Sequence, residues 1–422
     1  MKPSRILYVL LAPLSAATFN VNSTADAADA NPGNGVCAIA GQSNTCTLRA
    51  AIEESNALAG DDAVNVPAGN YSLSLGALLV TGNVRVLGPV AGLARVDGQL
   101  LSRVFQVNSG RVELHYLDIV NGLALGGSGG GVFNDRGQVL IGKCRVRSNR
   151  ADTGGAGIHN NSAGIVSIEE STIGTNGHLV GGDAKPQRGG GIQNNGVLYV
   201  DRSSIYGNVA GRAGGIFGGG SAYLIMRNST VSGNKADIDT GGILNGGTAY
   251  LNNSTVAFNQ GQVKPPAIDG FDPASAGGIS GGSFHIANTV LAKNTNGPGT
   301  GLGTNLDCGG NITSAGHNLV LETAGCVIGG DLTGNLAGQD PMLQALALND
   351  GSTMNHALPA GSVAVNAGNP AAPDGLSNHC EPVDQRYRLR GVGPAVGKCD
   401  IGSHERNGMP GQVGAAPGPP RP

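Results

Sequence analysis

Gly-Ala-Gly-Ile-His-Asn at residues 155–160 is one copy of a phrase that occurs six times between residues 129 and 281. The other copies are Gly-Gly-Gly-Val-Phe-Asn from Gly129, Gly-Gly-Gly-Ile-Gln-Asn from Gly189, Ala-Gly-Gly-Ile-Phe-Gly from Ala213, Gly-Gly-Ile-Leu-Asn from Gly241 and Gly-Gly-Ile-Ser-Gly from Gly277. Their β-branched residues lie 26, 34, 24, 27 and 36 residues apart. A period in the twenties, stretched by insertions, is typical of a stacked solenoid.

A second phrase, of the type Ser-Thr-Val-x-x-Asn, follows each glycine phrase. The first five copies end at Asn149, Asn176, Asn208, Asn234 and Asn259. Glycine at this density is costly in helices, whereas the coils of a parallel β-helix use it at corners that need a positive φ. We therefore predict that these asparagines stack from coil to coil as a structural ladder and bond backbone groups left unpaired at the corners, in preference to binding a ligand.

The predicted fold is all-β: a right-handed, single-stranded parallel β-helix with an N-terminal capping helix and disulfide-stapled ends. Thr47 can cap a helix over the following ten residues, which would cover the first coil. The seven cysteines contain three local pairs, Cys37–Cys46, Cys308–Cys326 and Cys380–Cys399, and leave Cys144 as a buried thiol. The net charge is only -3 and no basic cluster indicates a nucleic-acid partner.

The chain divides into five expected segments. Residues 1–17 have the charged start, apolar run and small-residue site of a signal peptide. Residues 18–61 form an N-terminal cap, 62–300 the β-helix repeats, 301–406 a C-terminal region, and 407–422 a disordered tail rich in Gly and Pro. The mature chain contains no predicted transmembrane segment. The signal peptide and the paired cysteines together indicate a secreted, surface or periplasmic protein, which is expected to be a monomer.

Two motifs resemble known families. The stretch Thr45-Cys-Thr-Leu-Arg-Ala-Ala-Ile-Glu-Glu-Ser-Asn56 resembles the CSLREA domain, departing from its name at two positions. The elements Asp384-Gln-Arg386 and Cys399-Asp-Ile-Gly-Ser-His-Glu405 resemble the choice-of-anchor Q domain, and the repeats between resemble β-helices of the polymorphic outer-membrane-protein and pectate-lyase-like kind. The resemblance implies an exported bacterial surface or extracellular protein. No anchor helix or LPxTG-type signal follows Glu405, which favours release.

Candidate ligand-binding residues gather in the segments that join an asparagine phrase to the next glycine phrase. They are Asp183, Lys185, Arg188, Asp237, Asp239, Asp269 and Asp272. Since insertions on one face of a solenoid commonly form its binding face, we expect these residues to share one edge. The alternative is a solvated rim of surface turns. No cofactor is expected, although Asp237, Asp239 and Asp269 could hold Ca²⁺.

The favoured function is non-catalytic adhesion or glycan binding, with an extracellular glycan or a host or cell-surface component as partner. A polysaccharide lyase, hydrolase or epimerase and a purely structural exoprotein remain alternatives. No catalytic residue is assigned, because the strand carboxylates and cations Glu169, Asp201 and Arg227 do not repeat from coil to coil. A strand-face Asp pair with bound Ca²⁺ would favour an enzyme, and a flat, polar or aromatic-lined groove without it would favour binding.

Overall fold

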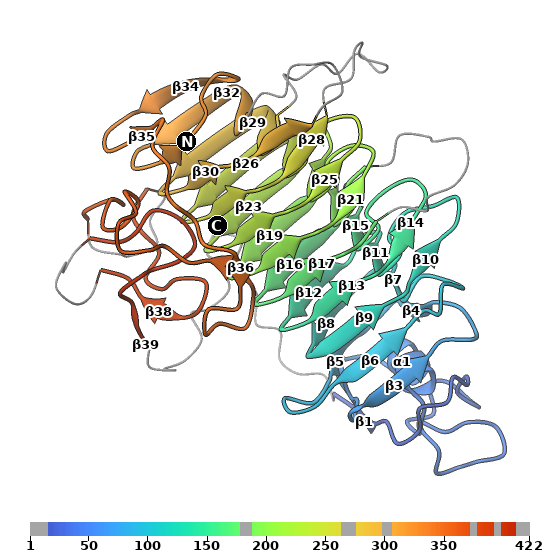
Figure 1. Cartoon of the computed structure of the whole chain (residues 1–422). Coiled ribbons are helices and arrows are strands. Elements are labelled where there is room, and N and C mark those ends of the chain that lie inside the picture. Colours follow the sequence, from blue (N-terminus) through green and yellow to red (C-terminus); the bar gives the residue numbers. More distant parts are fainter. Residues whose placement is uncertain are drawn as a thin grey trace.

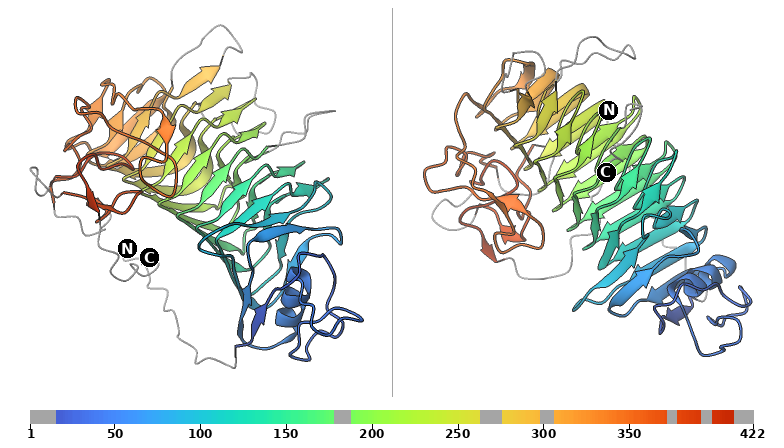
Figure 2. Two further views of the ribbon diagram at one scale, coloured as in Figure 1. Left: turned by 60° about the horizontal axis from the view of Figure 1, so that its bottom comes forward. Right: turned by 45° about the vertical axis from the view of Figure 1, so that its right-hand side comes forward.

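The computed structural model describes residues 16–177, 188–262, 276–297, 306–371, 378–391 and 398–410. It is a parallel β-helix whose coils stack along one axis, with a separate C-terminal region lying along one side of the later coils (Figures 1 and 2). The only helix in the described ranges is α1 (Leu48–Ala57). The predicted all-β parallel architecture is confirmed.

Each typical coil contributes strands to three sheets. Sheet 1, the largest, has 18 strands. It comprises β1 (Thr18–Asn20), β2 (Asp61–Asn65), β4 (Leu78–Val80), β5 (Asn83–Leu87), β7 (Phe105–Val107), β8 (Arg111–His115), β11 (Val132–Asn134), β12 (Gln138–Gly142), β15 (Ile158–Asn160), β16 (Ile165–Glu169), β18 (Ile192–Asn194), β19 (Val197–Asp201), β22 (Ile216–Gly218), β23 (Tyr223–Arg227), β26 (Ile243–Asn252), β29 (Ile279–Ala287), β32 (Cys308–Ala315) and β34 (Cys326–Asp331).

Sheet 2 has 11 strands. They are β3 (Gly69–Ser72), β6 (Ala94–Asp97), β9 (Leu117–Val120), β13 (Arg145–Arg147), β17 (Thr172–Gly174), β20 (Ser204–Tyr206), β24 (Thr230–Ser232), β27 (Thr255–Ala257), β30 (Val290–Ala292), β33 (Leu319–Val320) and β35 (Leu336–Ala337). Sheet 3 is formed by short strands: β10 (Leu123–Ala124) pairs with β14 (Arg150–Ala151), and β21 (Val209–Ala210), β25 (Lys235–Ala236), β28 (Gln260–Gln262) and β31 (Thr295–Gly297) pair in order.

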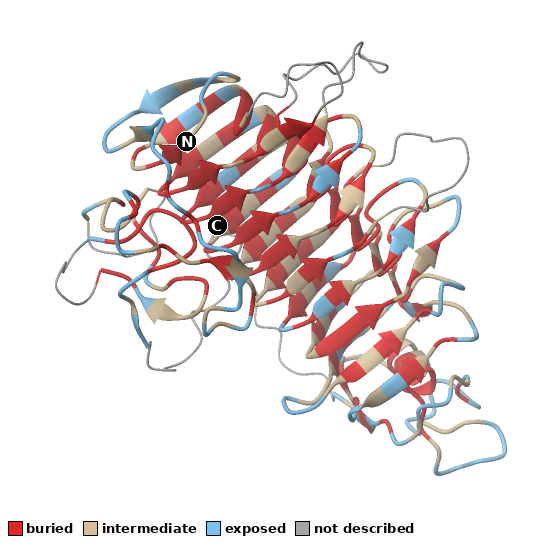
Figure 3. Ribbon diagram, in the orientation of Figure 1, coloured by how far each residue is buried: buried red, intermediate tan, exposed pale blue. Residues whose placement is uncertain are grey.

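The register of the coils follows the glycine phrase. Val132 pairs with Ile158, which pairs with Ile192, and the series continues to Ile216, Ile243 and Ile279. All six side chains are fully buried, so each phrase places one β-branched residue in the same column of the core. Buried residues run along the whole stack (Figure 3), where equivalent side chains meet about 4.8 Å apart.

The asparagines of the second phrase stack beside the core. Each of the five donates from its backbone N–H and its Nδ2 to the Oδ1 of the next asparagine, at 2.9 to 3.1 Å. The ladder continues through Asn294 to Asp307. Glycine in the first phrase makes room for it: a Cβ on Gly157 would lie 2.9 Å from the Nδ2 of Asn176. The two phrases therefore recur together, because the glycines of the first leave space for the asparagine side chains of the second.

A serine ladder lies at the corner between sheets 1 and 2. The hydroxyl of Ser171 accepts from the N–H of Cys144, and the hydroxyl of Ser203 accepts from the N–H of Ser171. Cys144 thus occupies a serine position, buried and unpaired, where its thiol contacts the carbonyl oxygens of Leu114 and Gly142. Burial raises the pKa of this thiol to about 12.

Parallel pairing is found on both sides of the expected repeats at residues 62–300. β1 pairs with β2, and the parallel pairing continues through β34 and β35. The later coils lack the glycine phrase, so the sequence pattern ends before the coiling does. The capping helix forms as predicted: Thr47 accepts from the N–H of Ala50, and Leu48 and Ile52 pack into the core.

The described residues after β35, namely 338–371, 378–391 and 398–410, fold back onto the later coils, and we call them the C-terminal region from here on. It contains two short antiparallel pairs, β36 (Leu346–Ala347) with β37 (Asn355–His356) and β38 (Arg388–Leu389) with β39 (Met409–Pro410). Leu343, Leu358, Ala364 and Ile401 pack against the outward residues Ala257, Val290 and Ala292 of sheet 2 as a second hydrophobic cluster. All three predicted disulfides are present, one in the N-terminal cap, one between β32 and β34, and one in this region.

The Asp-Gln-Arg and Asp-Ile-Gly-Ser-His-Glu elements hold the C-terminal region in place. The buried side chain of Gln385 accepts from the hydroxyl of Thr230 and donates to the carbonyl of Ser203, both in the β-helix. Asp384 accepts hydrogen bonds from Arg386 and from the N–H of Glu405, which joins the two elements. These residues are therefore structural.

Candidate functional site

The edge proposed from the sequence is only partly described by the structure. Asp183, Lys185, Asp269 and Asp272 lie outside the described residues. Arg188 lies over the ring of Phe217, 5.4 Å from its centroid, and Asp237 is exposed. Asp239 is buried, and its Oδ2 accepts from Nε and Nη2 of Arg212 at 3.0 and 2.9 Å.

Asp239 is therefore not a residue of an exposed binding edge, which corrects the sequence assignment. Its partner lies one coil earlier, a neighbour that linear spacing within the acidic segment does not indicate. The guanidinium also weakens the case for Ca²⁺ at Asp239, because the cation would compete with a buried ion pair. No group of three or more His, Cys, Asp or Glu side chains in the described ranges could hold a metal ion.

A different surface brings aromatic and charged side chains together: the outer face of sheet 1 on its later coils. Strand alternation turns every second residue outward, and the register stacks these residues in columns. One column contains Tyr199, Ile225, Tyr250 and His285, and the column beside it contains Tyr223. We call the surface of Tyr199, Tyr223, Tyr250 and His285 the tyrosine face.

Three rings of the tyrosine face, those of Tyr223, Tyr250 and His285, form a continuous platform. The Tyr250 and His285 rings are stacked, with centroids 4.6 Å apart and planes inclined by 11°. Tyr223 meets Tyr250 at 5.7 Å and 53°. The two tyrosines are 36% and 40% exposed, so their rings are accessible from solvent on a rigid sheet. Their spacing is set by backbone pairing and needs no further ordering on binding.

A column of polar residues, the residues that end the strands, runs alongside this face. Glu169 pairs in register with Asp201, Asp201 with Arg227, and Arg227 with Asn252. Glu381 reaches in from the C-terminal region, where its Oε1 lies 3.5 Å from Nε of Arg227 and accepts from Nδ2 of Asn252 at 3.0 Å. The C-terminal region therefore borders the tyrosine face with a hydrogen-bonding rim.

The electrostatics of the rim centre on Asp201. Burial raises the pKa of this carboxyl to about 6, against the opposing effect of Arg202, with which it forms an ion pair. Arg202 in turn lies over the ring of Tyr387 at 4.4 Å, and Tyr387 donates to Oε1 of Glu170 at 2.9 Å. Burial also raises the pKa of the Tyr387 hydroxyl. Asp201 can thus change protonation just below neutral pH.

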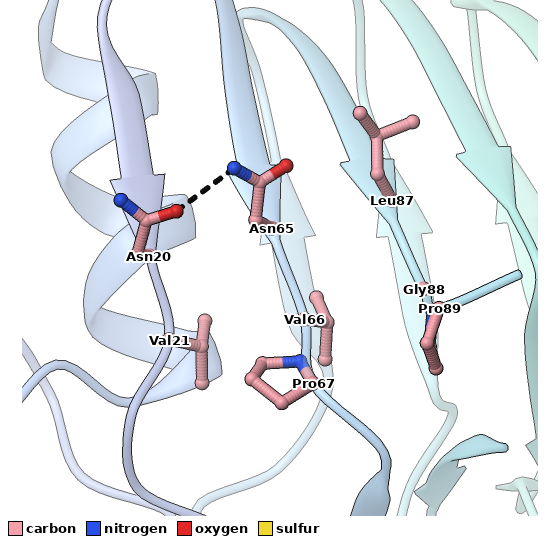
Figure 4. A pocket seen from close by; sticks show the side chains of 8 residues that line it. All are labelled: Asn20, Val21, Asn65, Val66, Pro67, Leu87, Gly88 and Pro89. Atoms are coloured by element: carbon pink, nitrogen blue, oxygen red, sulfur yellow. Dashed lines mark hydrogen bonds between the residues drawn. The ribbon is translucent and has the colours of Figure 1, made fainter. Parts of the chain in front are cut away.

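An open pocket of about 280 Å³ lies at the same strand ends in the first coils (Figure 4). It is lined by Asn20, Val21, Asn65, Val66, Pro67, Leu87, Gly88 and Pro89. The Asn65 amide donates to Oδ1 of Asn20, so part of its polar lining is already paired. With no titratable side chain in its lining, this pocket offers no group for acid–base chemistry.

The tyrosine face could have been found by aligning the coils. Glu169, Asp201 and Arg227 each stand two residues before the serine that begins the second phrase. The sequence interpretation treated them as unrelated because their chemical types differ from coil to coil. Only the register assigns Tyr199, Tyr223 and Tyr250 to the outer surface.

Comparison with known proteins supports the fold. No family model and no curated protein matches the chain. Among solved structures, the chain is similar to pectate lyase Pel9A, with 14% identity and a TM-score of 0.54 over 93% of this chain and 98% of that one. A mannuronic acid specific polysaccharide family 6 lyase from human gut microbiota aligns over 65% of this chain and 78% of its own, with 13% identity and a TM-score of 0.29. The first likeness shows a shared pectate-lyase-like parallel β-helix fold. No helix in the described ranges is long and apolar enough to cross a membrane.

Proposed function

We propose that the protein is an exported, non-catalytic β-helix protein that binds a polysaccharide along the tyrosine face. The observation that carries the proposal is the exposed Tyr223–Tyr250–His285 platform beside a rim of hydrogen-bonding groups. The faces of aromatic rings are electronegative and attract the C–H groups of a sugar ring. Tyrosine supplies rigid, amphipathic contact area at a low conformational-entropy cost.

The rim would give this face its specificity. Arg227 is a donor and Asp201 an acceptor, with side chains 26% and 17% exposed, so hydroxyl groups of a sugar could find both kinds of partner. Asn252 and Glu381 are buried and bonded to each other, and they hold the rim in place. The platform also suits a chain of sugars, because its rings follow one another along the β-helix axis on three successive coils. A linear glycan would lie across several coils instead of entering a closed cavity.

Export belongs to the same proposal. The three disulfides are consistent with an extracellular protein. The proposed signal peptide at residues 1–17, the monomeric state and the CSLREA and choice-of-anchor Q assignments rest on sequence patterns alone.

The test is a glycan array with the wild-type protein, followed by calorimetry on each glycan that binds. Tyr250→Ala and Tyr223→Ala should each weaken binding about 5- to 30-fold, because truncating a buried aromatic contact costs about 1–2 kcal/mol. Tyr250→Phe should retain most affinity, since the ring remains. Phe258→Ala is the matched control: its side chain is 39% exposed but lies outside the face. Failure of every glycan to bind, or equal affinities for wild type and both alanine variants, would overturn the proposal.

Polysaccharide cleavage is the second candidate, and one observation favours it. Glu169, Asp201 and Arg227 form a column in which the pKa of Asp201 is raised to about 6, within the range useful for general acid–base catalysis. Acidic and neutral polysaccharides should be incubated with the protein and assayed for unsaturated products and new reducing ends. Turnover that disappears in Asp201→Asn would replace the binding proposal with an enzymatic one.

A further inference from the structure

Three arginines surround one buried carboxylate on the outer face of sheet 2, in the earlier coils. Asp118 is fully buried. Its Oδ2 lies 3.0 Å from Nε of Arg95 and 2.7 Å from Nη2 of Arg147, while its Oδ1 accepts from Nε of Arg147 at 2.8 Å and lies 3.9 Å from Nε of Arg145. The register explains the cluster, because Arg95, Asp118 and Arg145 are paired in sequence on β6, β9 and β13. We call these four residues the arginine cluster.

The arginine cluster carries more positive charge than it neutralises. Three guanidinium groups share a single carboxylate, which leaves a surplus of two charges in a chain whose net charge is -3. Asp97 lies two residues from Arg95 on β6 and two strands from Arg147, where its charge offsets part of this surplus. It also accepts from the side chain of Asn121. The arginine side chains are 40%, 52% and 35% exposed, so each reaches solvent.

Most of the guanidinium donors in the cluster are unused. A guanidinium has five N–H donors. Within the described residues, Arg95 uses one of them on Asp118, and Arg147 uses two. Asp118 thus fixes one edge of these side chains and leaves the other edge directed away from it. This arrangement preorganises the donors for a second anion.

The rest of sheet 2 shows that this exposure is specific to the earlier coils. In the later coils the outward residues are small, such as Ala257 and Ala292, and the C-terminal region covers them. In the earlier coils Arg147 occupies the column of Ala257 and Ala292, and Arg95 and Arg145 occupy the column of Val290. In the described residues the C-terminal region makes no hydrogen bond or ion pair with these arginines. The same sheet is therefore packed at one end and charged at the other.

We propose that the arginine cluster binds carboxylate or sulfate groups of an acidic polysaccharide. Arginine suits these groups because its planar fork matches their oxygens. Arg95 and Arg145 are two strands apart, about 10 Å along the axis from the strand spacing. An extended polyanion can place successive charged groups on both, whereas an open sheet surface has no cavity to enclose a small free anion. This site is separate from the tyrosine face and does not depend on it.

The experiment measures binding of polygalacturonate, a sulfated polysaccharide and neutral dextran by biolayer interferometry at several salt concentrations. We expect both acidic polymers to bind and dextran not to, with affinity that falls as salt rises. Arg95→Ala/Arg145→Ala should weaken binding about tenfold or more. Arg95→Lys/Arg145→Lys keeps the two charges but loses the planar guanidinium groups. Its binding affinity should lie between those of the double alanine variant and wild type. Circular dichroism checks that each variant is folded.

The matched control is Arg111→Ala/Arg136→Ala, which removes two exposed charges paired with Glu113 and Asp135, away from the cluster. Equal losses in the two double alanine variants would reduce the effect to net charge and overturn the site. So would tighter binding of double-stranded DNA than of either acidic polysaccharide, or no binding of either polymer at low salt. The loss caused by Arg95→Ala/Arg145→Ala should be the same size in wild type and in a Tyr223→Ala/Tyr250→Ala background, so failure of the tyrosine face can be told apart from failure of the cluster.

Discussion

Replacing Asn208 by alanine removes one rung from the middle of the asparagine ladder. Its Oδ1 accepts from the N–H and Nδ2 of Asn176, and its Nδ2 donates to Oδ1 of Asn234 and to the carbonyl of Ile173. After the change, Nδ2 of Asn176 keeps its bond to the carbonyl of Val146, and Oδ1 of Asn234 keeps the N–H of residue 208. The backbone N–H of Asn176 loses its acceptor, Oδ1 of Asn208, and the carbonyl of Ile173 loses its side-chain donor, Nδ2 of Asn208.

The carbonyl of Ile173 lies within the parallel pairing of β17 with β20 and keeps a backbone partner there. One buried N–H left unpaired costs about 1–3 kcal/mol, which is the predicted loss in unfolding free energy. Urea unfolding followed by circular dichroism measures the total, and hydrogen exchange at the amide of Asn176 measures the local effect. Asn311→Ala, at an exposed position on β32, is the control. A loss below about 0.5 kcal/mol, within the range of ordinary surface substitutions, would refute the assignment of the ladder as a stabilising element.

Three further predictions concern other parts of the molecule. Cys144 should resist alkylation in the native state and react after denaturation, because burial raises the pKa of its thiol to about 12; rapid native labelling would contradict this. Gln385→Ala should speed hydrogen exchange in residues 338–410 and leave the β-helix protected, because Gln385 bonds Ser203 and Thr230, whereas Gln344→Ala, exposed in the same region, should have no effect. Asp201 has a folded-state pKa of about 6, raised by burial, so its stabilising contribution is complete below the unfolded value of 3.8 and declines as pH rises through 6. Relative to Asp201→Asn, the unfolding free energy of wild type should therefore fall between these pH values in a chemical-denaturation series, and parallel pH profiles would exclude that role.

The fold was predictable because the spacing of a few residue types along the sequence reveals the repeat of the coils. Val132 and Ile158 mark one core column, and Asn149 and Asn176 mark the ladder, so periodicity and chemistry agree from coil to coil. The sequence interpretation attributed the glycines to positive φ angles. The structure shows two reasons for glycine: Gly155 has φ of +56°, whereas a Cβ on Gly157 would lie 2.5 Å from the carbonyl oxygen of Gly191 and 2.9 Å from Nδ2 of Asn176.

The candidate site was harder to predict because it depends on contacts between residues that do not repeat. Tyr223 and Tyr250 are neighbours only through the lateral pairing of β23 and β26, and Glu381 joins them from a segment over a hundred residues later. For Asp239 the error was the opposite, because a structural residue was assigned to the candidate site. Its acidic neighbourhood indicated an exposed site, but its ion pair with Arg212 across coils makes it a buried structural residue.

The C-terminal region has a consequence for how this β-helix can change in length. Its hydrogen bonds reach corner residues from Glu170 to His317, so it fits only a fixed number of coils between them. Gaining or losing one coil inside that interval would displace half of those contacts by about 4.8 Å, more than a hydrogen bond can absorb. A coil added among the strands before β12 would leave every one of them in place. Length variation among relatives of this chain should therefore be concentrated in the earlier coils, where the arginine cluster lies.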